Sequence, residues 1–170
     1  MSTRSLTVFL DDVGVQVVVW YKHHDGFPIC YGKFLSEICA EESTEMDAEA
    51  FASKLFAKCV IAYGIKEFNV EDEYELFQEQ ARLLLVDYVY VISKYEDYNR
   101  LPFVEVFANR YHHKDGSYTL KSVFCGLGAE FFKWTKALDP QTEYTIGFEE
   151  EIEDGKEVQV ESVRNLEGCE

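Results

Sequence analysis

The most informative stretch of the sequence is Val15-Gln16-Val17-Val18-Val19-Trp20-Tyr21-Lys22-His23-His24-Asp25-Gly26-Phe27-Pro28-Ile29-Cys30-Tyr31-Gly32-Lys33-Phe34-Leu35. Residues 15–21 are mostly β-branched or aromatic, which is typical of a buried strand. Asp25-Gly26 is a turn dipeptide, and Pro28 suits the first position of a helix. The apolar residues that follow have the spacing of one helix face, and they are Tyr31, Phe34, Leu35, Ile38 and Cys39. The stretch therefore predicts a strand that turns sharply into a helix.

Alternating and helical patterns predict the remaining elements. The predicted strands are residues 6–10, 15–21, 83–93, 103–111 and 117–125, and a terminal hairpin follows over residues 142–163. The predicted helices are residues 28–39, 48–63, 71–82 and 127–138. We expect an α+β fold, in which an antiparallel sheet made of an N-terminal hairpin and a central meander packs with two to four helices and a C-terminal hairpin. One domain over residues 1–164 suits the length of 170 residues, with residues 165–170 as a frayed tail.

Charge is the unusual feature of the composition. Asp and Glu number 32 against 16 Lys and Arg, which gives a formal net charge of −16. Direct binding to nucleic acid or to an anionic membrane is disfavoured, because both need clustered basic residues. A basic surface on a protein partner suits this charge.

Hydropathy and cysteine usage predict a cytoplasmic protein, in the host cytoplasm if the chain is viral. No apolar run reaches the roughly 18–20 residues that a membrane span needs, and the first residues lack the apolar core of a signal peptide. The five cysteines form no C-x-x-C motif, and they are Cys30, Cys39, Cys59, Cys125 and Cys169. Buried thiols are therefore favoured.

All four histidines lie in two similar corners, Tyr21-Lys22-His23-His24-Asp25-Gly26 and Tyr111-His112-His113-Lys114-Asp115-Gly116. If strand 15–21 neighbours strand 103–111, the two corners can form a metal site or an acid–base site. The residues of that site are His23, His24, Asp25, His112 and His113. In the alternative interpretation the histidines are surface turn residues, and Asp25 caps the helix that begins near Pro28.

Other catalytic signatures are absent from the sequence. There is no G-x-S-x-G, no P-loop and no G-x-G-x-x-G. Gly126-Leu127-Gly128 precedes a predicted helix and can offer N–H groups to an anion, although three residues carry little information. No cofactor is expected.

The carboxylates gather in three blocks. Residues 37–49 hold six acidic residues and no basic one, and residues 67–79 repeat that count. Residues 139–170 hold eleven acidic residues against Lys156 and Arg164. A ribbon of carboxylates can imitate nucleic-acid phosphates and occupy a basic groove; otherwise the blocks are solvated faces that keep the protein soluble.

The corner Tyr21-Lys22-His23-His24-Asp25-Gly26-Phe27-Pro28, with Gly32-Lys33-Phe34-Leu35 behind it, resembles small uncharacterised prokaryotic and viral proteins. These proteins carry a Y-x-H-x-D-G-[YF]-P corner between a β-hairpin and a helix, and the resemblance covers about residues 5–40. It implies no catalytic role. In size, acidity and lack of motifs the chain also resembles acidic phage anti-defence proteins.

Three functions follow as hypotheses. The first is a non-enzymatic acidic binding protein that engages a basic surface of a protein partner, such as a phage-encoded inhibitor of a host nucleic-acid-binding defence effector. Its expected contact residues are Glu71, Asp72, Glu73, Glu75, Glu149, Glu150, Glu151, Glu153 and Asp154. The second is a small metal- or His-dependent enzyme with its site at the two histidine corners. The third is a self-assembling domain, for which the sequence leaves the oligomeric state open.

Overall fold

The structure is a computed structural model of the chain. It describes residues 3–11, 14, 16–42, 46–63, 66–68, 85–94, 101–112 and 116–139, and for residues 16, 17, 66–68 and 110–112 it describes the backbone only. The strands are β1 (Ser5–Leu10), β2 (Gln16–Lys22), β3 (Lys66–Phe68), β4 (Tyr88–Ser93), β5 (Phe103–His112) and β6 (Ser117–Leu127). The helices are α1 (Lys33–Glu41), α2 (Ala48–Tyr63) and α4 (Gly128–Ala137), and a π-helical turn, η1 (Pro28–Gly32), leads into α1. The predicted α+β class is confirmed.

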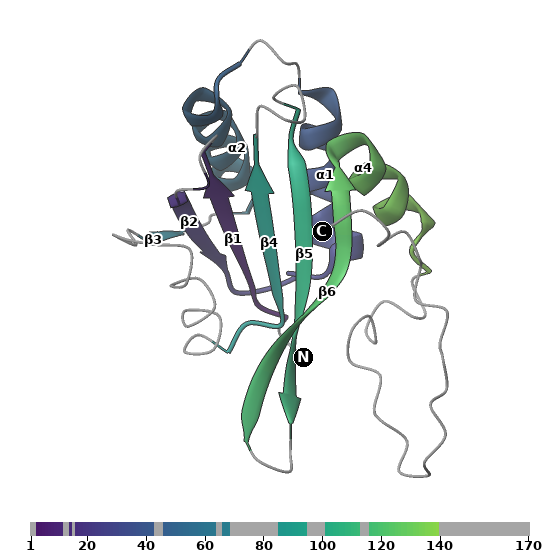
Figure 1. Cartoon of the computed structure of the whole chain (residues 1–170). Coiled ribbons are helices and arrows are strands. Elements are labelled where there is room, and N and C mark those ends of the chain that lie inside the picture. The colour runs from purple at the N-terminus through teal and green to yellow at the C-terminus, as the bar shows by residue number, and fades with distance from the viewer. Residues whose placement is uncertain are drawn as a thin grey trace.

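The described strands form one sheet in the order β3-β2-β1-β4-β5-β6 (Figure 1). The N-terminal hairpin β1–β2 and the meander β4–β5–β6 are antiparallel, as the sequence predicts. The two units join through β1 and β4, which run parallel in a register that pairs Ser5 with Tyr88. The sheet is therefore mixed, although most of its pairings are antiparallel.

Helices cover one face of this sheet. Figure 1 shows α1, α2 and α4 behind the strands. Their apolar side chains, among them Leu35, Phe51 and Phe131, share one buried cluster with Phe9 and Tyr90 of the central strands. Because side chains alternate along a strand, this face takes every second residue of β1 and β4.

The other face of the sheet carries a second apolar cluster. It consists of Leu6, Val8, Leu10, Val19, Val86, Val89 and Val91, with Tyr21, Phe107 and Leu120 packed beside them. The central strands β1 and β4 are therefore buried on both faces, although Ser5 and Thr7 of β1 are polar.

Element boundaries differ in detail from the predictions. β4 begins at Tyr88, five residues later than the predicted strand. Asp47 caps the start of α2, since its carboxylate accepts a hydrogen bond of 2.8 Å from the N–H of Ala50. The predicted helix over residues 71–82 and the predicted hairpin over residues 142–163 lie outside the described residues.

Cysteine placement agrees in part with the sequence. Cys39 and Cys59 are free and buried, as predicted, whereas Cys30 is free and exposed. Cys125 takes part in a disulfide, which the sequence did not predict. Among the described helices, none has both the length and the apolar character needed to cross a membrane.

Candidate functional site

The polar corner after β2 is fastened to β1 by its backbone. The N–H of Gly26 donates a hydrogen bond of 3.0 Å to the carbonyl of Thr3. The hydroxyl of Tyr90 donates one of 2.8 Å to the carbonyl of Gly26. A Cβ atom on Gly26 would lie 2.8 Å from the Cβ of Ser5 and 2.9 Å from the carbonyl carbon of Arg4. Only glycine therefore lets the corner approach β1 this closely.

Asp25 has a different role from the predicted helix cap. Its φ angle is 55°, which is the left-handed conformation that Asp tolerates better than most residues. Phe27 is the cap residue of η1, and no side chain makes a capping hydrogen bond there. The prediction that Asp25 caps the helix is therefore wrong, and Asp25 instead supplies the left-handed residue before Gly26.

The first histidine pair is exposed beside this turn. The Nδ1 atom of His23 lies 2.7 Å from the hydroxyl of Tyr21. The rings of His23 and His24 meet edge to face with their centroids 4.4 Å apart. His23 therefore contacts both Tyr21 and His24.

The second histidine corner does not neighbour the first in the sheet. β1 and β4 lie between β2 and β5, so the adjacency on which the metal-site hypothesis depended is absent. Through the register, Lys22 is level with Ala108, and His112 is four residues further along β5. His113 and the side chain of His112 lie outside the described part of the chain. Within that part, no group of three or more His, Cys, Asp or Glu side chains could hold a metal ion.

A buried lysine stands at the inner side of the same corner. Lys22 is 6% exposed, and its ammonium donates a hydrogen bond to the carbonyl of His24. The same group lies 4.3 Å from the ring centroid of Tyr63 and 5.7 Å from that of Tyr31. Burial lowers the pKa of Lys22, and the nearby Asp25 partly opposes this shift. One carbonyl oxygen and the faces of two aromatic rings therefore stabilise the positive charge of Lys22.

Tyr31 connects this lysine to the core. Its hydroxyl accepts a hydrogen bond of 2.6 Å from the indole N–H of Trp20 and lies 3.0 Å from the hydroxyl of Thr7. It donates a hydrogen bond of 3.7 Å to the sulfur of Cys59. Burial raises the pKa of Tyr31 well above its ordinary value, and it raises the pKa of Cys59 to about 12. Both groups therefore stay neutral at physiological pH.

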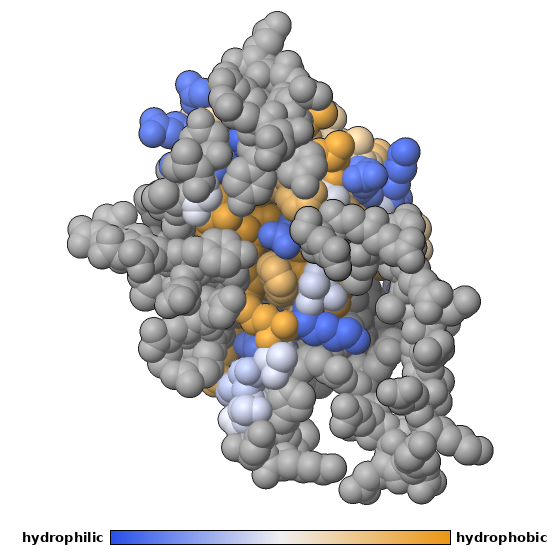
Figure 2. Space-filling view, viewed as in Figure 1, coloured by the Kyte–Doolittle hydropathy of each residue, from blue (hydrophilic) through white to orange (hydrophobic). Residues whose placement is uncertain are grey.

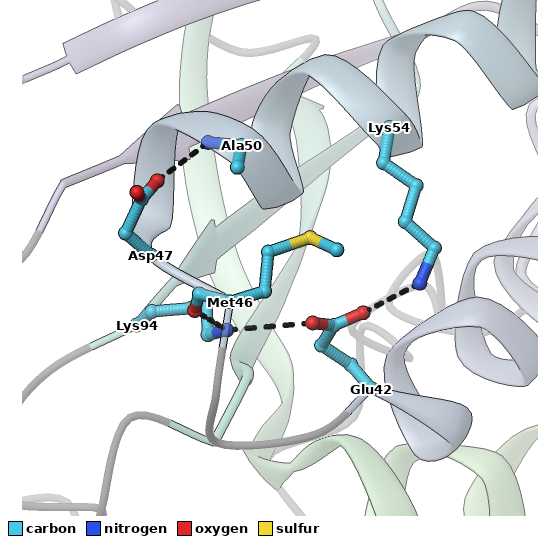
Figure 3. Close-up of polar contacts among 6 residues, drawn as sticks. All are labelled: Glu42, Met46, Asp47, Ala50, Lys54 and Lys94. Atoms are coloured by element: carbon cyan, nitrogen blue, oxygen red, sulfur yellow. Dashed lines mark hydrogen bonds and ion pairs between the residues drawn. The ribbon is translucent and has the colours of Figure 1, made fainter.

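A second buried lysine lies where α1, α2 and β4 meet (Figure 3). Lys94 is 1% exposed, and its ammonium donates to the carbonyl of Met46 and lies 3.6 Å from a carboxylate oxygen of Glu42. The other oxygen of that carboxylate pairs with Lys54 at 2.8 Å. Burial lowers the pKa of Lys94 although Glu42 opposes the shift. Glu42 belongs to the first acidic block of the sequence, yet it faces inward.

The Gly126-Leu127-Gly128 segment has no N–H group left for an anion at its last two residues. The N–H of Leu127 donates to the carboxylate of Glu130 at 2.8 Å. The N–H of Gly128 donates to the carbonyl of Pro102 at 2.8 Å. The segment therefore forms the N-terminal end of α4.

The acidic residues expected to bind a partner are all outside the described part of the chain, and they are Glu71, Asp72, Glu73, Glu75, Glu149, Glu150, Glu151, Glu153 and Asp154. The structure instead reveals Lys22, Lys94 and Glu42, which the sequence analysis did not single out. A signal for Lys22 was present, because a period of two places it on the same strand face as Trp20. Lys94 had the same signal relative to Ile92.

The comparisons with known proteins add no relative. No protein-family description, curated protein or solved structure matches this chain.

Proposed function

We propose that this chain is a non-enzymatic acidic binding protein whose carboxylates engage a basic surface of a protein partner. The partner class is a nucleic-acid-binding protein, and a phage-encoded inhibitor of a host defence effector is the biological form that we propose. The support is the charge: 32 acidic residues stand against 16 basic ones. A basic groove built for phosphates accepts a ribbon of carboxylates by the same electrostatics.

The observation that carries the proposal is the inward placement of two lysines. Lys22 and Lys94 are buried. The ammonium of Lys22 contacts the carbonyl of His24 and the ring of Tyr63, and the ammonium of Lys94 pairs with Glu42. Two cations and one anion are thereby withdrawn from the surface. Among the described residues, burial of these three groups therefore removes one more positive than negative charge from the surface.

Attraction between the carboxylates of this chain and a basic partner surface makes their association faster and sensitive to salt. Opposite charges steer encounter over a distance set by the Debye length, which is about 8 Å at physiological ionic strength. A partner groove that neutralises several carboxylates therefore loses affinity as salt rises. We place the contact at the second and third acidic blocks, at the residues named in the sequence analysis.

Charge reversal tests the proposal. The full chain is immobilised, proteins are captured from a bacterial lysate, and the affinity of the isolated captured protein is measured for two variants. The first variant is Glu71→Lys/Asp72→Lys/Glu75→Lys, in the second block. The control is Glu37→Lys/Glu41→Lys/Glu49→Lys, which changes the net charge equally at exposed positions of α1 and α2.

We expect the second-block variant to weaken binding by at least tenfold and the control to weaken it by less than threefold. Equal weakening by both variants would show a non-specific charge effect, and no weakening by either would exclude a carboxylate interface at these residues. Either result contradicts the proposal.

A further inference from the structure

The last turn of α2 exposes large apolar side chains. Val60 and Tyr63 are each 37% exposed, and Ile61 is 86% exposed. Among the described residues, the only other large apolar side chain that is exposed is that of Leu85. Exposed apolar residues that gather in one place mark a contact with another molecule, whereas single ones scattered over a surface need no explanation. The end of α2 is therefore a candidate docking surface.

The sheet face opposite the helices offers no comparable surface in the described part of the chain. Figure 2 shows this face, with apolar residues gathered at its centre. The second apolar cluster belongs to it, and its members Leu6, Val8 and Val89 are each 0% exposed. The apolar side chains that a partner can reach are therefore those of α2.

The exposed side of α2 changes in size along the helix. Ala50, Ser53, Ala57 and Ile61 follow one another at spacings of three and four residues, which places them on one side of the helix. All four are exposed, and the opposite side of α2 is buried in the core. The first three side chains are small and the last is large, so this side has a shallow N-terminal half and a raised C-terminal end.

The raised end is anchored in the core. The ring of Tyr63 lies edge to face against the rings of Phe34 and Tyr31, with centroids 5.1 and 5.6 Å apart. The ammonium of Lys22 lies 4.3 Å from the centroid of the same ring. The last turn of α2 is therefore formed before any partner binds, which lowers the entropic cost of docking.

Charge favours a second copy of this chain as the occupant. The net charge of −16 makes two copies repel each other wherever their carboxylates face each other. Residues 50–66 contain no Asp or Glu, and they form the longest such run in the sequence. A contact made by this run brings none of its own side chains against the other copy as a carboxylate.

The change in size makes α2 complementary to itself in an antiparallel pair. In that arrangement Ile61 of each copy packs over Ala50 and Ser53 of the other, so that a large side chain meets small ones at both ends. A parallel pair would place Ile61 against Ile61 and would leave a gap between the small residues, which costs packing energy.

The charged residues of α2 favour the same direction. The exposed Lys58 lies in the second half of α2, whereas Asp47 and Glu49 are exposed at its N-terminal end. An antiparallel pair brings the lysine half of one copy toward the acidic end of the other, and a parallel pair would bring like charges together. Lys54 lies nearer the middle, where Glu42 of the same chain already pairs with it at 2.8 Å.

We propose that two copies of this chain form a symmetric dimer through an antiparallel pair of α2 helices, with Ile61 of each copy on the small residues of the other. A two-fold axis across the middle of α2 closes such a pair. One helix from each copy buries less surface than an obligate interface, so the dissociation constant should be micromolar. The inference does not rest on the proposed function, whose contact lies in other residues.

Sedimentation equilibrium of the full chain, at concentrations up to about 0.1 mM, tests the proposal. Ile61→Asp places a charge in the contact. Leu85→Asp is the matched control, because Leu85 is an apolar residue outside α2 that is 49% exposed. Both positions are exposed, so both variants should fold, which circular dichroism checks. We expect Ile61→Asp to raise the dissociation constant of the dimer at least tenfold and the control to change it less than twofold.

Disulfide trapping tests the direction of the pair. Cys30→Ser first removes the exposed native thiol. Protein that also carries Ala50→Cys is then mixed with protein that carries Val60→Cys, and the mixture is mildly oxidised. We expect disulfides that join position 50 of one copy to position 60 of the other.

Three results would overturn the proposal. The first is a native chain that stays monomeric over the whole concentration range. The second is equal weakening of the dimer by Ile61→Asp and Leu85→Asp, which would place the contact elsewhere. The third is trapping of disulfides only between identical positions, which would make the pair parallel.

Discussion

Asp25 and Gly26 are adjacent, yet each is needed for a different reason. Asp25 takes the left-handed backbone conformation, with φ of 55°. Gly26 leaves room for β1, since a Cβ atom there would come within 2.8 Å of Ser5. A turn dipeptide can be recognised from sequence, but the division of roles between its residues depends on what packs against it.

The first prediction is that Gly26→Ala lowers the free energy of unfolding by about 2 kcal/mol, because the added methyl overpacks the contact with β1. Urea denaturation measures the change. Asp25→Gly is the control, and we expect a change within about 0.5 kcal/mol, because glycine adopts the left-handed conformation without strain. Equal effects of the two substitutions would show that the corner is not packed as described.

The second prediction concerns the buried ion cluster in Figure 3. Glu42→Gln leaves the ammonium of Lys94 buried without a counter-charge, so we expect a loss of about 3 kcal/mol in unfolding free energy. Lys54 is the other partner of Glu42, and the side chain of Lys54 is 37% exposed. Lys54→Met should therefore cost less than about 1 kcal/mol. If Lys54→Met proves as costly as Glu42→Gln, Lys94 is not the cation that Glu42 stabilises.

The packing of α1 on α4 depends on one glycine. A Cβ atom on Gly128 would lie 2.5 Å from the carbonyl oxygen of Cys39 in α1. Deeper in the same interface, the hydroxyls of Ser36 and Thr135 are 2.8 Å apart. The backbones of the two helices therefore approach each other closely at Gly128, and a buried pair of hydroxyls joins the helices further along.

The third prediction is that Gly128→Ala forces these helices apart and costs about 3 kcal/mol of unfolding free energy. The neighbouring exposed substitution Ala129→Ser should change it by less than about 0.5 kcal/mol. Thermal and urea unfolding of both variants give the comparison. A Gly128→Ala protein as stable as the native chain would contradict the close approach of α1 and α4.

Elements with local signals were predictable from the sequence. The helix over residues 48–63 repeats its apolar residues at helical spacing, and α2 has the predicted bounds. The hairpin and the meander follow from turns between alternating strands. The parallel pairing of β1 with β4 was not predictable, because its partners are 83 residues apart and no turn fixes their register. The three-residue strand β3 is too short to show any period.

The candidate site was less predictable than the fold. Four histidines in two similar corners suggested a shared site, but sheet order separates β2 from β5. Sheet order depends on long-range packing, which sequence periodicity does not encode. The inward lysines could be recognised only as polar residues on an apolar strand face, a pattern that also fits an edge strand.

The fourth prediction concerns the stability of the whole molecule above neutral pH. The pKa of Cys59 rises from its ordinary value of 9.0 to about 12 on folding, because the thiol is buried. Between these values the unfolded chain loses the proton and the folded chain keeps it, so this group makes stability fall as pH rises. The contribution is up to about 1.4 kcal/mol per pH unit.

Lys22 and Lys94 act in the opposite sense. Their pKa values are lowered on folding, so each raises stability as pH approaches its ordinary value. The contribution of Cys59 is therefore isolated by comparing the native chain with Cys59→Ala. From pH 9 to pH 10.5 we expect the native chain to lose stability more steeply than the variant. Parallel profiles would mean that the thiol is solvated in the folded state.

The fifth prediction tests the central claim, that an acidic surface of this chain engages a basic protein surface. The affinity of the native chain for its isolated captured partner is measured while salt is raised from about 0.1 to about 0.5 M, which shortens the Debye length to about 4 Å. We predict that the dissociation constant rises at least tenfold and that the Glu71→Lys/Asp72→Lys/Glu75→Lys variant shows a shallower salt dependence. A dissociation constant that stays constant over this range would contradict the account.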